Sequence, residues 1–197
     1  NLTKFITVVN DYKPDIIFNL CESVNTLTQL EKNAIALYEI IDIPFTGSGM
    51  LTLGICLNKG FAKRLFKTHK IPTPDYMILN DLEFDELPPN LKYPLIIKPG
   101  MEDGSTGITS KSVVKNMKSL KSRAKYIFRN FKQFAIVENY ISGKELQISV
   151  IGNDNPLILA IAELDYKGLS KKIPKICTYS AKWQPDTNYF KFTNPRI

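Results

Sequence analysis

The sequence predicts a chain of mixed class, an α/β layer followed by α+β structure, and two patterns predict it. Over the first part of the chain, helical and strand-length apolar segments alternate, which is typical of a parallel sheet covered by helices. After Asp75, strand-like segments dominate. There the alternating residues 145–150 and the apolar run 157–162 predict an antiparallel hairpin. We therefore expect a parallel layer first and antiparallel sheet afterwards.

Four segments carry the predicted α/β layer. Apolar residues repeat at helical spacing near the N-terminus, and a capping box at Thr28–Glu31 is expected to open a second helix. Two short apolar runs, one after each helix, have the length of strands. Because such a layer normally opens with a strand, we expect the first strand to lie upstream of Asn1. The four segments are residues 2–9 (helix), 16–20 (strand), 30–41 (helix) and 43–45 (strand).

A proline-rich connector marks the first predicted domain boundary. Asn58 is expected to cap a helix, and Ile71-Pro72-Thr73-Pro74 ends that helix as a stiff link to the following strand. We expect further strands around residues 75–79, 93–98 and 134–138. The predicted division is an N-terminal domain at residues 1–57, a central subdomain at 58–136 and a partial C-terminal subdomain at 137–197.

Composition limits the location and the chemistry of the chain. It has 197 residues and a net charge of +7, and it contains no run of the roughly 20 apolar residues that a membrane span requires. Its three cysteines are widely spaced and odd in number, so we expect reduced thiols in a cytoplasmic protein. The single histidine, His69, falls at the end of a predicted helix, so histidine-based nucleophilic chemistry has little support.

A basic segment follows the central strands. Residues 111–132 contain eight basic side chains and no acidic one, at a spacing that predicts one charged face of an amphipathic helix. The favoured interpretation is a solvated helix face over an apolar stripe. The alternative is a nucleic-acid patch, but no aromatic side chains for base stacking interleave with the charges. The charged face is Lys118, Lys121, Lys125, Arg129 and Lys132.

The segment Tyr93–Gly107 carries the strongest chemical signal. A buried strand is expected to end at Lys98 and Pro99, and a loop of small residues, Gly104-Ser105-Thr106-Gly107, follows it. Glycine and serine let backbone N–H groups approach an anion, and the lysine supplies a point charge. The segment therefore predicts a nucleotide site, although it lacks the G-x-x-x-x-G-K-[ST] pattern and does not open a helix.

Several motifs in a fixed order extend this signal to most of the chain. Ile43-Pro44-Phe45-Thr46-Gly47-Ser48-Gly49 is similar to "GIPYTGSG", and Ile71–Pro74 is similar to "GIPTP". Val137–Glu145 is similar to "VE-x-x-I-x-G-x-E". In this order the motifs resemble the ATP-grasp superfamily and, within it, the D-alanine–D-alanine ligase family. The resemblance runs from about Ile16 to Phe192 and implies a partial ATP-grasp fold.

The resemblance implies a set of nucleotide contacts. Two lysines would hold the α- and β-phosphates, a mobile small-residue loop would cover them, and a third lysine would reach the γ-phosphate. A glutamate would accept from the adenine amino group, hinge residues would supply an apolar wall, and a second glutamate would bind the ribose. Lys59 and Lys98 are the lysines at the α- and β-phosphates, Gly104, Ser105 and Gly107 form the covering loop, and Lys182 is the lysine at the γ-phosphate. Glu138 is the adenine acceptor, Tyr140 and Ile141 are the hinge residues, and Glu145 is the glutamate at the ribose. Among them Lys98, Lys182 and Ser105 are the predicted catalytic residues.

The implied reaction is amide-bond formation by an ADP-forming carboxylate–amine ligase that acts through an acyl phosphate. Its expected partners are ATP, Mg²⁺ and amino-acid or short-peptide substrates, and a homodimer is compatible with the sequence. The segment Leu20–Leu27 lacks the family's "HGxxGEDG" histidine and glycines. There Glu22 is a candidate to bind a substrate ammonium, with a surface or capping role as the alternative. No metal ligands are predicted within the chain; those for Mg²⁺ are expected beyond Ile197.

Two other functions compete with the ligase. A catalytically inert nucleotide-binding module would keep the same phosphate contacts without the metal-binding segment. A basic nucleic-acid-binding protein would instead use the basic stripe from Lys111 to Lys132. The order of the motifs favours the ligase over both alternatives.

Overall fold

The structure is a computed structural model that describes residues 2–197. The chain forms two compact units, of which the first ends at Ala62 and the second begins at Lys63. The division falls inside helix α4 (Lys59–Thr68), which Asn58 caps as predicted by accepting a hydrogen bond from the Phe61 amide at 3.1 Å. The three-part domain division stays a prediction.

The first unit is mainly helical. A tyrosine, Tyr38, packs between Phe5 and Phe45, with ring centroids 5.5 and 5.7 Å apart. Next to it, Ile35 is fully buried. These two residues are the buried positions of the second helix. The elements are α1 (Leu2–Tyr12), a 3₁₀ turn η1 (Thr28–Leu30), α2 (Glu31–Ile40) and α3 (Met50–Leu57).

The prediction of two strands in this unit is largely wrong. Ile17 and Phe45 form a single parallel bridge, so the direction of pairing is as predicted, but no extended strand forms at residues 16–20 or 43–45. Phe18 and Leu20 are mostly exposed. A two-strand pairing without a wider sheet is only marginally stable, which explains why the bridge does not extend.

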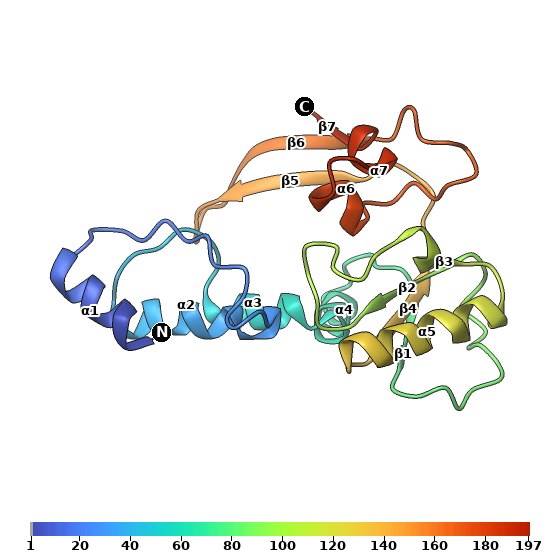
Figure 1. Cartoon of the computed structure of the whole chain (residues 1–197), viewed down its shortest axis with the longest axis horizontal. Helices are drawn as coiled ribbons and strands as arrows, with labels where there is room; N and C mark the ends of the chain where they lie inside the picture. The colour runs from blue at the N-terminus through green and yellow to red at the C-terminus, as the bar shows by residue number, and fades with distance from the viewer. Residues whose placement is uncertain (1) are drawn as a thin grey trace. The chain divides into compact units, whose positions relative to one another are not determined.

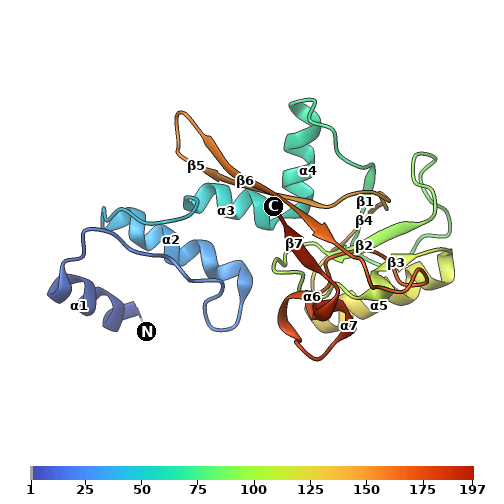
Figure 2. The same ribbon diagram turned by 90° about the horizontal axis from the view of Figure 1, so that it is seen from above.

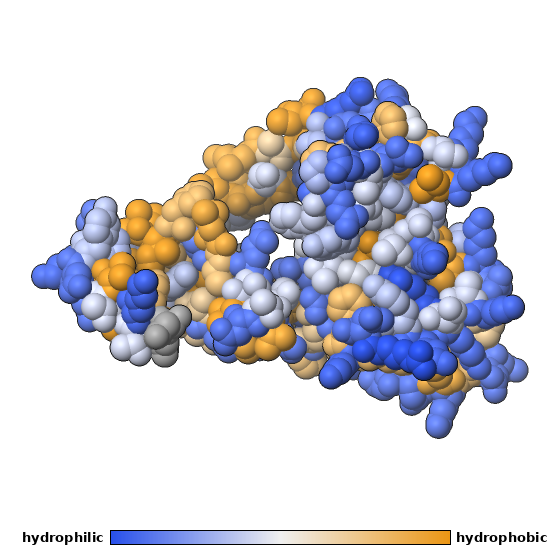
Figure 3. Space-filling view, viewed as in Figure 1, coloured by the Kyte–Doolittle hydropathy of each residue, from blue (hydrophilic) through white to orange (hydrophobic). Residues whose placement is uncertain are grey.

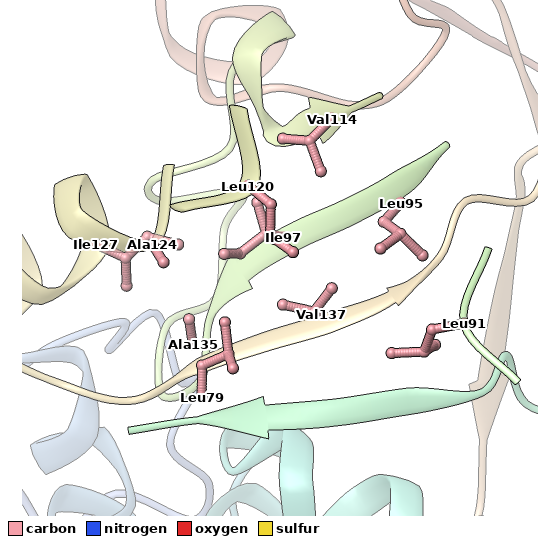
Figure 4. Packing of buried hydrophobic residues seen from close by; sticks show 10 residues of the cluster. All are labelled: Leu79, Leu91, Leu95, Ile97, Val114, Leu120, Ala124, Ile127, Ala135 and Val137. Atoms are coloured by element: carbon pink, nitrogen blue, oxygen red, sulfur yellow. The ribbon is translucent and has the colours of Figure 1, made fainter. Parts of the chain in front are cut away.

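The second unit opens with a four-stranded antiparallel sheet in the order β1-β4-β2-β3. Its strands are β1 (Tyr76–Leu79), β2 (Leu95–Pro99), β3 (Val113–Val114) and β4 (Ala135–Asn139). Helix α5 (Met117–Phe131) packs against it, as Figures 1 and 4 show. The core between them consists of Leu79, Leu91, Leu95, Ile97, Val114, Leu120, Ala124, Ile127, Ala135 and Val137. The predicted amphipathic helix is confirmed, with most of its charged face exposed.

A second antiparallel sheet follows in the order β5-β6-β7. It contains β5 (Leu146–Ile151), β6 (Leu157–Asp165) and β7 (Asn194–Arg196), and Figure 2 shows β7 beside β6. The predicted hairpin is confirmed, but its first strand is not half buried, although alternation of polar and apolar residues is typical of half-buried strands. All six residues of β5 are exposed, and Figure 3 shows apolar surface over the hairpin. Short helices α6 (Tyr179–Trp183) and α7 (Asn188–Lys191) lie between β6 and β7 in sequence.

Two further findings bear on the composition. The cysteines Cys21, Cys56 and Cys177 are free thiols. Across residues 2–197, the helices are too short or too polar for any of them to cross a membrane.

Candidate functional site

The site is organised around Glu138, a carboxylate on β4 that is only 5% exposed. In the sheet register Ile96 of β2 lies opposite Glu138, so Lys98, two residues further along β2, projects from the same face. The Lys98 ammonium pairs with Oε1 of Glu138, and Lys63 from α4 pairs with Oε2. One buried carboxylate therefore has a separate cation on each oxygen.

The two lysines determine the charge state of this carboxyl group. Burial raises the pKa of Glu138, but the charges and hydrogen bonds of Lys98 and Lys63 outweigh burial and hold the pKa below its ordinary value. Glu138 is therefore an ionised acceptor near neutral pH. A buried, ionised, hydrogen-bond-accepting carboxylate suits recognition of an amino group on a ligand.

The loop after β2 has the conformation expected of an anion cradle. Gly104, Ser105 and Gly107 all have positive φ, at 54°, 63° and 75°. A side chain at Gly107 would have its Cβ 2.6 Å from Pro99 Cγ, so this position requires glycine for space as well as for its backbone. Backbone in left-handed conformations can turn N–H groups toward a concavity, which favours binding of an anion.

Helix α6 and the segment before it are bonded to this loop. The Ser105 hydroxyl donates to the Cys177 carbonyl at 2.8 Å, and the Trp183 indole N–H donates to the Gly104 carbonyl at 3.0 Å. The Tyr179 amide donates to the Ile108 carbonyl at 3.0 Å. The structure thereby brings the α6 segment that carries Lys182 onto the predicted phosphate loop.

The positive charge of Lys182 influences the pKa of the Cys177 thiol. Burial raises the pKa of the Cys177 thiol, and Glu145 raises it further, while Lys182 and the Ser105 hydroxyl act in the opposite direction. Cys177 therefore lies within electrostatic range of both Glu145 and Lys182. Lys182 itself is exposed.

The predicted ribose-binding residue, Glu145, is held by an aromatic hydroxyl. Tyr166 donates to Glu145 Oε2 at 2.5 Å, and burial followed by this carboxylate raises the pKa of Tyr166 far above its ordinary value. Tyr140 donates to the Lys175 carbonyl at 3.2 Å, and burial and Glu145 raise its pKa as well. Ile141, next to it, is exposed. Tyr140, one of the two predicted hinge residues, and Glu145 thus share one neighbourhood.

Two predicted site residues belong to the first unit. Lys59 is the first residue of α4, and Glu22 is exposed in the segment that precedes η1. Their roles stay predictions. Within residues 2–197, no cluster of three or more His, Cys, Asp or Glu side chains is positioned to hold a metal ion.

Sequence reasoning missed two cations that support the site. Lys63 lies one helical turn after Lys59, so the same face of α4 was already marked as functional. Arg123 is buried on α5, as are Leu120 and Ala124 on its apolar face. The Arg123 guanidinium donates to the Gly107 carbonyl and, at 3.2 Å, to the Ser112 hydroxyl. A charged residue at an apolar helix position was the available signal. Arg123 anchors the end of the loop.

Comparison with known proteins decides the family. The model for the "D-ala D-ala ligase C-terminus" matches residues 65–195, well over half of the chain. The chain belongs to the D-alanine–D-alanine ligase family. A D-alanine–D-alanine ligase from Carboxydothermus hydrogenoformans is 34% identical over 159 residues, which are 76% of this chain and 47% of that protein.

Solved structures agree with the predicted ATP-grasp fold. The D-alanine–D-alanine ligase from Bacillus anthracis complexed with ATP has a TM-score of 0.61 and 25% identity, covering 83% of this chain and 53% of that one. The L-amino acid ligase from Bacillus licheniformis has a TM-score of 0.60 and 20% identity, covering 81% and 34%. The fold prediction is confirmed. The chain spans about half the length of the curated relatives it matches.

Proposed function

We propose that this chain binds ATP and forms part of an ADP-forming carboxylate–amine ligase. The observation that carries the proposal is the bonding of two segments far apart in sequence, in which Ser105 donates to Cys177 and Trp183 donates to Gly104. A loop with positive φ and a lysine-bearing helix docked on it together offer backbone donors and an ammonium group. These are the groups that neutralise a polyphosphate.

The roles of the chain's residues in nucleotide binding follow from these donors. The bound nucleotide supplies the phosphoryl group that activates a carboxylate for attack by an amine. Gly104, Ser105 and Gly107 would hold phosphate oxygens, while Lys98 and Lys182 neutralise their charge, because positioning and electrostatic stabilisation account for most of such catalysis. Lys59 is proposed to join Lys98 at the phosphates.

The remaining contacts concern the nucleoside. Glu138 would accept from the adenine amino group as an ionised carboxylate. Tyr140 and Ile141 would form the hinge and apolar wall. Glu145, oriented by Tyr166, would accept from the ribose hydroxyls.

Substrates and metal form a further part of the proposal. The carboxylate and amine are proposed to come from amino acids or short peptides, and Glu22 remains the candidate for a substrate ammonium. Mg²⁺ is proposed as a cofactor with ligands beyond Ile197. Within residues 2–197, no cluster of three candidate ligands is present. We place the protein in the cytoplasm, which its free thiols support.

A second candidate function is an inert nucleotide-binding module, which would use the same glycine loop and lysines to hold the phosphates. Measuring phosphate release with ATP, Mg²⁺ and a panel of amino acids and dipeptides separates the two functions. Release that requires a carboxylate and an amine together supports the ligase. A flat response across the panel supports the inert module.

The binding step has its own test. Replacing Lys98 with alanine should weaken ATP binding by about 30-fold or more, the equivalent of roughly 2–4 kcal/mol for a lost charge contact to phosphate. Isothermal titration calorimetry measures the dissociation constant. The control is Lys125→Ala, which removes an exposed lysine of α5. Unchanged ATP affinity in Lys98→Ala would contradict the assignment.

A further inference from the structure

The Lys98 ammonium cannot stay paired with Glu138 and also contact the phosphates of a nucleotide as the proposed function requires. The proposed function requires its ammonium at the phosphates, but in this structure it pairs with Glu138. If Lys98 were the sole cation at Glu138, moving it to a nucleotide would leave a buried carboxylate without a counter-charge, which is strongly unfavourable. Some other group must therefore keep Glu138 compensated when Lys98 leaves.

Lys63 has the geometry for that task. It pairs with Oε2, the oxygen that Lys98 does not use, and it also donates to Thr73 Oγ1 at 2.8 Å and to the Pro74 carbonyl at 3.1 Å. Its ammonium lies 5.4 Å from the centre of the Tyr76 ring, where a cation is attracted to the ring face. Contacts from three separate partners besides Glu138 fix Lys63 in place.

The two lysines differ in their surroundings as well as in their partners. The Lys63 side chain is 11% exposed, while that of Lys98 is 28% exposed. Lys63 therefore sits as a buried, multiply bonded cation, and Lys98 sits at the accessible side of the same carboxylate. This asymmetry matches one resident cation and one that can exchange its partner.

We propose that Lys63 is the resident counter-ion of Glu138 and that it allows Lys98 to pass from Glu138 to the phosphates of a bound nucleotide. The inference rests on the proposed ATP binding and deepens it. Lys63 is a positioning residue that acts through Glu138. Glu138 stays ionised throughout, so it remains an acceptor for the adenine amino group while Lys98 changes partner.

A double-mutant cycle on ATP binding tests the exchange. Lys63→Met should weaken ATP binding by about tenfold, because Lys98 then becomes the sole counter-ion of Glu138 and is retained there. Lys98→Met should weaken binding by about 30-fold in the wild-type background but by only about threefold in the Lys63→Met background. A purely structural Lys63 would give penalties that multiply, and that result would overturn the proposal.

The matched control for Lys63→Met is Lys67→Met. Lys67 lies one turn further along α4, pairs with Asp75 at 3.1 Å in an exposed position and lies 5.0 Å from the centre of the same Tyr76 ring. Because it does not pair with Glu138, its loss should change ATP affinity by less than about twofold. A tenfold loss in Lys67→Met would show that any cation on this face matters, and would overturn the specific role of Lys63.

A measurement on the unaltered 197-residue chain covers the case in which Lys63→Met fails to fold. The ¹⁵N resonances of the lysine Nζ atoms, assigned with Lys63→Arg and Lys98→Arg, should respond differently to ATP: the Lys98 signal shifts and the Lys63 signal stays. Saturable ATP binding that moves both signals, or neither, overturns the exchange alone. Failure of the wild-type chain to bind ATP overturns the proposed function and the exchange with it.

Discussion

The two antiparallel sheets of the second unit are alike in sequence and unlike in burial. Both are rich in isoleucine, leucine and valine, yet β2 and β4 are almost wholly buried while the β5–β6 hairpin is largely exposed. Helix α5 covers the first sheet and contributes Leu120, Ala124 and Ile127 to its core (Figure 4). Strand pattern thus predicts pairing, while burial depends on whether another layer packs on the sheet.

The sheets also differ in how they carry a glutamate. Glu138 on β4 is buried between two lysines, whereas Glu163 on β6 makes one exposed pair with Lys144 at 2.7 Å. A buried charge requires compensation, but an exposed pair is solvated by water. The covered sheet can therefore hold a charge in a fixed position, which is what a binding site needs.

The largest effect should come from Glu138→Gln, which leaves two lysines with no carboxylate. We expect a loss of about 3–5 kcal/mol in the free energy of unfolding near pH 7, as for breaking a buried pair. Urea unfolding measures it. Glu163→Gln is the control and should change stability far less, and equal losses in the two variants would remove the distinction between the sheets.

Glu138→Gln should also change how the free energy of unfolding depends on pH. Because the folded-state pKa of Glu138 lies below its ordinary value of 4.5, ionised Glu138 contributes stability that is present above pH 4.5 and is lost as the pH falls through the folded pKa. Glu138→Gln should therefore lose less stability than the wild type between about pH 5 and pH 3. Parallel stability–pH curves for the two proteins would contradict the assignment.

A smaller effect is expected from Ile97→Ala in the covered sheet. Ile97 is fully buried on β2, so truncation should cost about 2–4 kcal/mol through lost burial and the cavity left behind. The midpoint of urea unfolding, at an unchanged slope, measures the loss. A change below about 0.5 kcal/mol would mean that the core around α5 repacks freely.

The smallest effect is expected from Ile148→Thr in the hairpin. Ile148 is 54% exposed on β5, and threonine keeps the β-branched shape that suits a strand. The free energy of unfolding of this variant should differ from that of the wild type by less than about 0.5 kcal/mol. A loss as large as that of Ile97→Ala would show that the hairpin is buried in solution, and the comparison between the sheets would fail.

Local patterns predicted five strands and the long helix of the second unit, because these elements depend on neighbours in sequence; β3, α6, α7 and β7 were not predicted. The strands around Lys98 and Glu138, the helix from Met117 and the hairpin turn all carry their own apolar or turn signals. The glycine positions of the loop also followed from residue type, since Gly104 and Gly107 adopt positive φ.

The features that were not predicted depend on contacts between residues far apart in the sequence. Helix α3 was not predicted, and the Met50 amide at its start is satisfied by the Glu39 side chain from α2, which no local pattern reveals. The Lys63–Glu138 pair likewise joins residues far apart in the chain. The strand at residues 16–20 failed for the converse reason, because its apolar pattern was present but no sheet formed to receive it.

The indole of Trp183 rests on the Gly104 carbonyl, and it belongs to the sole tryptophan of the chain. Its fluorescence therefore comes from one place, the junction of the glycine loop with α6. Rearrangement of the loop would change the polarity and hydrogen bonding around that indole. The protein thus carries a built-in optical reporter of this glycine loop, readable in solution without any label.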